Sequence, residues 1–133
     1  MKNKRLTYLI AIIMTILLIA IGIGGKIYMD KKSFNDEMVK VVKSNEAKKV
    51  YERTIKNNDP KAFTADGVIQ SYEVDYDTVK HNPMGGIMVD LIVNGDQNLI
   101  IDVILDKNNE GILRNSAGGT SSDLDDLLNR KRE

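Results

Sequence analysis

The stretch IMVDLIVNGDQNLIIDVIL, residues 87–105, decides the fold of this chain. It holds two runs rich in branched apolar residues, 87–93 and 99–105, on either side of the dipeptide Asn94-Gly95. Asn-Gly favours a tight hairpin turn, because both residues tolerate a positive φ. Each run is apolar on both faces in part, which is typical of central strands. We therefore expect an antiparallel hairpin at the centre of a sheet.

Two further strands and a short helix are predicted around this hairpin. Residues 68–76 alternate polar and apolar side chains as a first strand, and a polar connection follows at 77–86. Residues 112–114 form a short fourth strand, and residues 122–130 carry leucines at helical spacing. Because the connections are short, the four strands are expected to form an antiparallel meander.

Residues 33–57, which precede the first strand, have the periodicity of an amphipathic helix. Apolar side chains recur from Phe34 onward at spacings of three and four. Ser33 with Asp36 resembles a capping box, so the helix is expected to begin there, and Ser44 marks a place where it can bend. The predicted class is α+β, with this long helix packed on the four-stranded meander and a short C-terminal helix. The arrangement resembles the cystatin-like folds.

The N-terminal part of the chain is of a different kind. Residues 6–25 contain no charged side chain, and twenty helical residues span roughly 30 Å, the thickness of the hydrocarbon core of a bilayer. Lys2, Lys4 and Arg5 precede this run, which favours a cytoplasmic N-terminus. The alternative is a cleaved secretory signal with its small-residue site near Ala20, but the run is longer than the roughly 7–15 residues of a signal core.

The sequence therefore predicts a single-pass signal-anchor protein of the cell membrane with four segments. A cytoplasmic basic N-terminus covers 1–5, and a transmembrane anchor in contact with the lipid bilayer covers 6–25. A juxtamembrane linker follows at 26–33, and an extracytoplasmic α+β domain covers 34–133.

The composition excludes several classes of function. The 133 residues carry 19 Lys and Arg against 19 Asp and Glu, with no basic cluster beyond the N-terminus, so nucleic acid is not expected as a partner. The chain has no Cys, which excludes thiolate catalysis, Cys-ligated zinc, iron–sulfur clusters and disulfides. It has a single His and no G-x-S-x-G or H-E-x-x-H motif, so we expect neither an enzyme nor a cofactor.

The polar connection and the first strand hold the candidate binding residues. The hexapeptide HNPMGG at 81–86 places one apolar side chain among residues that favour turns. Met84 is either an adaptable contact for a protein partner or a cap on the open end of the core. Two tyrosines share a face of the first strand and are a second place for contacts. The candidate binding residues are His81, Asn82, Met84, Tyr72 and Tyr76.

Two acidic groups are candidate metal ligands. Asp106, Asn108 and Glu110 match the first, third and fifth positions of a calcium loop, although the twelfth position lacks the bidentate Glu. A hairpin turn explains the same residues, because Asn, Asp and Gly tolerate left-handed conformations. Asp75 and Asp77 would point the same way on a strand, either to hold a metal ion or to keep a sheet edge soluble.

Several motifs together resemble one family. They are DPKAFT at 59–64, GVI at 67–69, HNPMGGI at 81–87 and the pair Gly118-Gly119, combined with the basic N-terminus and the apolar run. In these the chain resembles a family of small uncharacterised proteins from streptococci and Listeria that is classed as a domain of unknown function. The resemblance covers nearly the whole chain and implies that the protein is located in the envelope of a Gram-positive cell. It implies no catalytic residues.

Two classes of function follow from these observations. The first is an anchored module outside the cytoplasm that binds a protein, in one version an immunity or inhibitor protein against a secreted toxin or bacteriocin. The second is a ligand- or ion-sensing accessory component of a membrane complex, with the turn at 106–111 or the Asp75 and Asp77 pair as its site. The absence of a catalytic constellation favours the binding module.

Overall fold

The computed structural model describes residues 2–133, which form two units that divide after Asp36. The first unit is the greater part of α1 (Lys2–Val42), a continuous helix of 41 residues. Its large apolar side chains are exposed from Leu6 to Met29. Within the described residues, this is the one helix long and apolar enough to cross a membrane. By length and composition it is therefore compatible with a membrane anchor.

The amphipathic part of the chain does not begin as a separate helix. α1 runs without a break through residues 26–36, so the helix start predicted at Ser33 is wrong. These residues contain neither Gly nor Pro, and nothing in them ends a helix that has already begun. Burial begins at Met38 and is complete at Val42, whereas Phe34 remains exposed.

Ser44 separates α1 from α2 (Asn45–Asn58), at the place where the sequence predicts a bend. The Ser44 hydroxyl donates to the carbonyl of Val41 at 2.6 Å and accepts the backbone N–H of Ala47 at 3.1 Å. One side chain therefore satisfies a carbonyl at the end of the first helix and caps the start of the second.

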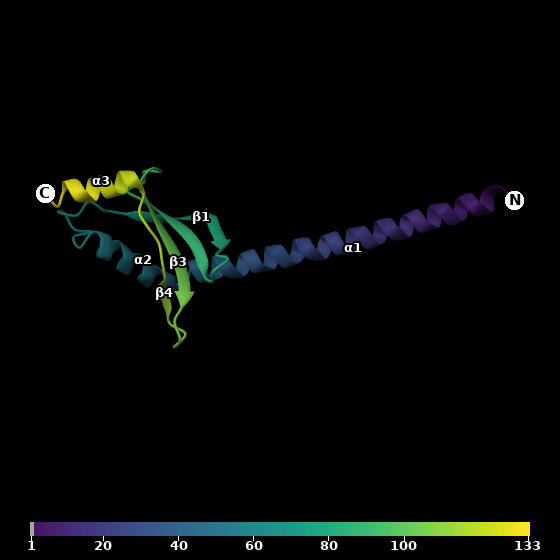
Figure 1. Ribbon diagram of the computed structural model, residues 1–133, viewed down its shortest axis with the longest axis horizontal. Helices are drawn as coiled ribbons and strands as arrows, with labels where there is room; N and C mark the ends of the chain where they lie inside the picture. The colour runs from purple at the N-terminus through teal and green to yellow at the C-terminus, as the bar shows by residue number, and fades with distance from the viewer. Residues whose placement is uncertain (1) are drawn as a thin grey trace. The chain divides into compact units, whose positions relative to one another are not determined.

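The strands form one antiparallel sheet in the order of the chain, which confirms the predicted meander and the α+β class. Figure 1 shows the curved sheet with α2 beside its last strand. α3 (Ser122–Arg130) occupies the range predicted for the C-terminal helix. The strands are β1 (Tyr72–His81), β2 (Ile87–Val93), β3 (Ile100–Lys107) and β4 (Leu113–Asn115).

β1 begins later than the sequence predicts, and it includes residues that were expected to connect two strands. The backbone N–H groups of residues 68–71 are taken by side chains, so these residues do not join the sheet. The buried Asp59 carboxylate accepts those of Val68 and Ile69, at 2.7 and 2.9 Å. Asn94 Oδ1 accepts those of Gln70 and Ser71 at 2.8 and 3.1 Å.

After β4 the chain stays paired with β3 without regular strand geometry. The Asp102 N–H donates to the carbonyl of Gly119 at 2.8 Å, and the Ser121 N–H donates to that of Ile100 at 2.9 Å. Gly118 passes so close to β3 that a Cβ there would lie 2.1 Å from the carbonyl oxygen of Asp102. This segment therefore covers the edge of β3 beyond the short β4.

The core lies between one face of the sheet and the helices. Tyr51 of α2 is buried in it, and its hydroxyl donates to the carbonyl of Val42 at 2.9 Å. The buried core residues of the two central strands alternate with residues that belong to the opposite face. We call this opposite side the outer face, and define it by Met88, Asp90, Ile92, Ile100, Asp102 and Ile104. The core residues that face it from within are Val89, Leu91, Val93, Ile101, Val103 and Leu105.

Candidate functional site

β1 contains a bulge at residues 76–79, where it departs from β2. Asp75 pairs with Asp90 and Lys80 pairs with Met88, so four residues of β1 stand opposite a single residue of β2. Extra residues of this kind bend a strand and increase its twist, and they are common at sheet edges and beside functional sites. The bulge therefore bends the edge strand immediately before its connecting loop.

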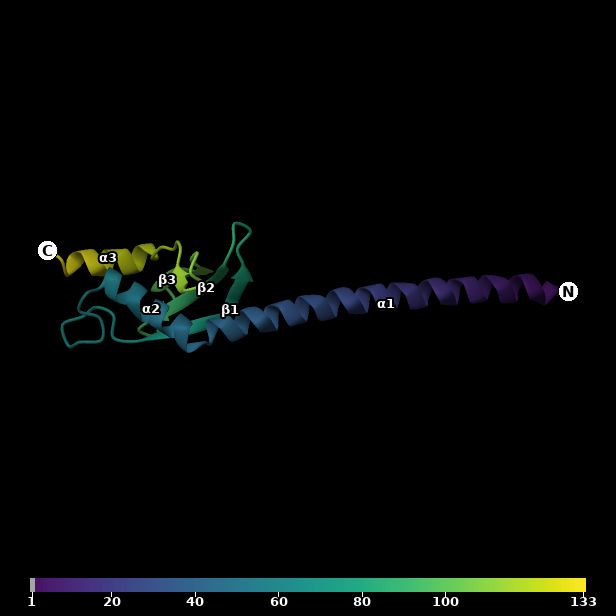
Figure 2. The ribbon, with the colours of Figure 1, turned by 90° about the horizontal axis from the view of Figure 1, so that it is seen from below.

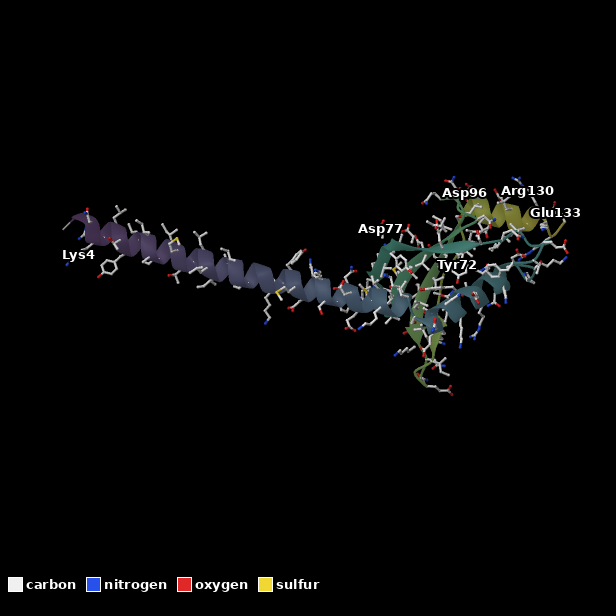
Figure 3. All side chains as sticks on the ribbon, turned by 180° about the vertical axis from the view of Figure 1, so that it is seen from behind. Lys4, Tyr72, Asp77, Asp96, Arg130 and Glu133 are labelled. Carbon is white, nitrogen blue, oxygen red and sulfur yellow. The ribbon has the colours of Figure 1, made fainter. Side chains whose placement is uncertain are left out.

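The hydroxyl of Thr78 holds the bulge together. It accepts the backbone N–H of Asp90 at 2.9 Å and donates to the carbonyl of Asp75 at 2.7 Å. The carboxylate of Asp75 accepts the N–H of Asp77 at 3.1 Å. Asp77 therefore lies in the bulge, whereas Asp75 still keeps strand register. Figure 3 marks Tyr72 near the start of β1 and Asp77 toward its end.

We call residues 81–86 the hairpin tip; they connect β1 to β2. Figure 2 shows this loop projecting beyond the strands. The Asn82 N–H donates to the carbonyl of Gly86 at 3.0 Å, and the Gly85 N–H donates to that of Asn82 at 2.9 Å. Asn82 Oδ1 also accepts the N–H of Met84 at 3.3 Å. The side chain and backbone of Asn82 therefore set the shape of the tip.

Two glycines make this shape accessible to the chain. Gly85 and Gly86 have φ angles of +106° and +87°, a region that residues with a side chain rarely adopt. A Cβ on Gly86 would also lie 2.6 Å from the carbonyl oxygen of Leu105. The GG pair of the HNPMGG motif is thus explained by backbone geometry.

Met84 is 96 % exposed, so the interpretation of this residue as a cap on the core is wrong. Met84 lies between Pro83 and Gly85 at the end of a hairpin, where no core is within reach of its side chain. His81 is exposed at the last position of β1, opposite Ile87. The structure therefore brings His81, Asn82 and Met84 together in one projecting loop.

The two predicted tyrosines differ in their surroundings. Tyr72 is half-buried, with its ring centroid 6.3 Å from that of Tyr51 and 6.1 Å from that of Phe63. Burial raises the pKa of Tyr72, and the nearby Glu52 carboxylate raises it further. Tyr76 is 45 % exposed, and the ammonium of Lys43 lies 5.0 Å from its ring centroid. Tyr72 belongs to the core, and Tyr76 is available for contacts.

Three carboxylates form a row across the outer face that the sequence analysis missed. Asp75, Asp90 and Asp102 occupy paired positions on β1, β2 and β3. Burial raises the pKa of Asp90 to about 6, helped by a hydrogen bond to the Asp102 carboxylate and by the charges of Asp102 and Asp75. The positive charge of Lys80 lowers the pKa of Asp90. A row of like charges on adjacent strands destabilises a sheet unless a cation neutralises it.

The length of the β2–β3 turn sets the register of this row. A two-residue turn at Asn94-Gly95 would place Asp90 opposite Leu99. Both turn residues do have positive φ, at 53° and 71°, but a second turn follows, in which the Leu99 N–H donates to the carbonyl of Asp96. The longer loop moves the register and brings Asp90 opposite Asp102.

The model of one protein family matches residues 8–127 of the chain, and this family is described as a protein of unknown function, DUF1310. The chain belongs to this family. The match confirms the resemblance to a family of unknown function. It includes most of the apolar run, the whole sheet and most of α3. No curated protein and no solved structure matches the chain significantly.

The acidic turn in this family member, between β3 and β4, uses its side chains on its own backbone. Asn108 Oδ1 accepts the N–H groups of Glu110 and Ile112, both at 2.9 Å, and Asp106 Oδ1 accepts the N–H of Lys107 at 2.8 Å. Among residues 2–133, no three His, Cys, Asp or Glu side chains are grouped as metal ligands. Calcium binding at Asp106, Asn108 and Glu110 stays a prediction.

Proposed function

We propose that this protein is a membrane-anchored, extracytoplasmic protein-binding module and that the hairpin tip is its contact surface. The observation that carries this proposal is the 96 % exposure of Met84 at the end of a loop whose shape is fixed by hydrogen bonds. An apolar side chain held in water gains by burial against a partner. Because the loop is already ordered, little conformational entropy is lost when it binds.

The anchor in this proposal is the apolar part of α1, with the N-terminus in the cytoplasm. Lys4 and Arg5 precede the apolar residues, and basic residues favour the cytoplasmic side of a membrane. This orientation places residues 37–133, and the hairpin tip with them, outside the cytoplasm.

An immunity or inhibitor protein against a secreted toxin or bacteriocin is the specific version of this function that we propose. Inhibitors bind through preformed loops whose backbone changes little on association. Methionine suits such a contact, because its flexible and polarizable side chain adapts to an irregular partner surface. Asn82 and His81 supply polar groups beside it.

The experiment is capture of partners by the full chain from its native membrane, followed by mass spectrometry. Met84→Asp is compared with Ile112→Asp, because Ile112 is an exposed apolar residue in the other hairpin turn at 56 % exposure. We expect Met84→Asp to lower the recovery of a stoichiometric protein at least tenfold, and Ile112→Asp to leave it unchanged. Equal recovery by both variants and the unaltered chain would contradict the proposal.

A further inference from the structure

The first of two complementary charged surfaces lies on α2. Lys49, Arg53 and Lys56 lie at spacings of four and three, which places them along one side of α2, and all three are exposed. The buried residues of α2 occupy the opposite side of the helix. α2 therefore carries a stripe of three cations that points away from the core.

The outer face of the sheet offers the complementary pattern. Asp75, Asp90 and Asp102 form its row of carboxylates. The pairs Met88–Ile104 and Ile92–Ile100 lie on either side of the Asp90–Asp102 pair in the strand register. A concavity of about 530 Å³ opens here. Its lining includes the acids Asp77, Asp90 and Asp102, the apolar Met88 and Ile104, and one cation, Lys80, so acids outnumber cations. A side chain that is apolar along its length and cationic at its end fits such a surface, as Lys and Arg do.

The two patterns also agree in length. Lys49 and Lys56 are seven residues apart, which is about 10 Å along a helix at roughly 1.5 Å per residue. Asp75 and Asp102 are two strand spacings apart, which is also about 10 Å at roughly 4.8 Å per spacing. A helix laid across the strands brings three cations within reach of three carboxylates.

We propose that the outer face of one copy binds α2 of a second copy, so that the stripe Lys49, Arg53 and Lys56 meets the row Asp75, Asp90 and Asp102. The two surfaces lie on opposite sides of the same fold, because α2 covers the core face of the sheet. The contact is therefore head-to-tail, and it continues from copy to copy into an open row or a closed ring. Confinement to one membrane raises the effective concentration of copies, and this last point rests on the proposed anchor.

Cysteine cross-linking of the full chain in lipid vesicles tests the contact, because the chain has no Cys of its own. One tagged chain carries Asn45→Cys, which is exposed one turn before Lys49, and another carries Ile104→Cys on the outer face. With a short bismaleimide we expect a dimer between the two variants and little dimer from either alone. Asp123→Cys, on the exposed first turn of α3, replaces Ile104→Cys as the matched control.

Charge reversal makes the test specific to the two patterns. A helix variant carries Lys49→Glu, Arg53→Glu and Lys56→Glu, and a sheet variant carries Asp90→Lys and Asp102→Lys. We expect each variant to lose at least nine-tenths of its cross-linking to itself, and a mixture of the two to recover it. Circular dichroism checks that both variants fold. If the sheet variant does not fold, Asp102→Asn, at an exposed position, replaces it. For Asp102→Asn we expect a reduced yield of cross-linking to itself, and no recovery on mixing with the helix variant.

The proposal is overturned by an Ile104→Cys dimer with itself, by cross-linking through the control position at equal yield, or by a yield that charge reversal does not change. Capture of a different basic protein at Ile104→Cys, without adducts between copies, would also overturn it. Met84→Asp separates this proposal from the proposed function, because we expect it to leave cross-linking between copies unchanged.

Discussion

Asp90 and Asp102 lie directly opposite each other on β2 and β3, and both belong to the outer face of the sheet. Burial is the main reason that the pKa of Asp90 rises to about 6, and a hydrogen bond to the Asp102 carboxylate and the charges of Asp102 and Asp75 raise it further. Like charges directly opposite each other on adjacent strands destabilise a sheet. The chain therefore retains a pair that costs stability, on the surface that we propose as an interface.

The Asp90→Asn variant tests the cost of this pair. Asp90 has a higher pKa in the folded chain than its ordinary value near 3.8, so the folded state binds more protons than the unfolded state between about pH 4 and 6. Stability therefore falls as pH rises through this window. A shift of this size corresponds to roughly 3 kcal/mol, which solvent screening at this partly exposed site reduces to about 1 kcal/mol.

We therefore expect Asp90→Asn to raise the free energy of unfolding at pH 7.5 by about 1 kcal/mol and to weaken its dependence on pH below 6. Urea denaturation of the full chain in detergent measures both. Asp126→Asn, an exposed acid of α3, is the control and should leave the slope between pH 4 and 6 unaltered. A pH profile of Asp90→Asn identical to that of the unaltered chain would contradict the raised pKa of Asp90.

Thr78→Val tests the role of the hydroxyl in the β1 bulge. Valine keeps the shape of the side chain but cannot accept the N–H of Asp90 or donate to the carbonyl of Asp75. We expect a loss of about 1–3 kcal/mol in the free energy of unfolding. Thr78→Ser keeps the hydroxyl and should retain most of the stability. If the two variants unfold at the same urea concentration, the hydroxyl does not hold the bulge.

Gly118→Ala and Gly119→Ala form a matched pair beside β3. A Cβ at Gly118 would lie 2.1 Å from the carbonyl oxygen of Asp102, whereas a Cβ at Gly119 meets nothing within 4 Å. Because the obstacle is backbone, we expect Gly118→Ala to cost at least about 2 kcal/mol and Gly119→Ala less than about 1 kcal/mol. Thermal unfolding of the two variants measures the difference. A larger effect at Gly119 would be inconsistent with this packing.

The orientation is tested by adding a protease to intact cells from which the outer wall has been removed. With residues 37–133 outside the cytoplasm, a C-terminal tag should disappear before lysis, while an N-terminal tag stays protected. A cytoplasmic protein followed in the same sample controls for leakage. A C-terminal tag that is cleaved only after lysis would show the opposite orientation.

The sequence predicts the parts of the fold that depend on periodicity alone. β2 and α3 have the predicted bounds, because an apolar run ending at Asn-Gly and leucines at helical spacing each have one local solution. The start of β1 is different, since Asp59 and Asn94 bind the backbone of 68–71 from far along the chain. No local pattern contains contacts of that kind.

In the candidate site, too, the sequence predicts the features that depend on local pattern and misses those that depend on distant contacts. The HNPMGG motif predicts a loop with one apolar residue, and the structure adds that Met84 is exposed rather than part of the core. The row of Asp75, Asp90 and Asp102 depends on the register of three strands. That register follows from a bulge and a long turn, neither of which alternation of side chains reveals.

Contact by the hairpin tip is tested most directly by a photoreactive amino acid at position 84 in living cells, compared with the same amino acid at position 112. We predict that irradiation joins position 84 to one defined protein and that position 112 gives no such adduct, because only the hairpin tip meets the partner. Adducts that are absent at position 84, or the same at both positions, would contradict a protein-binding function for this loop.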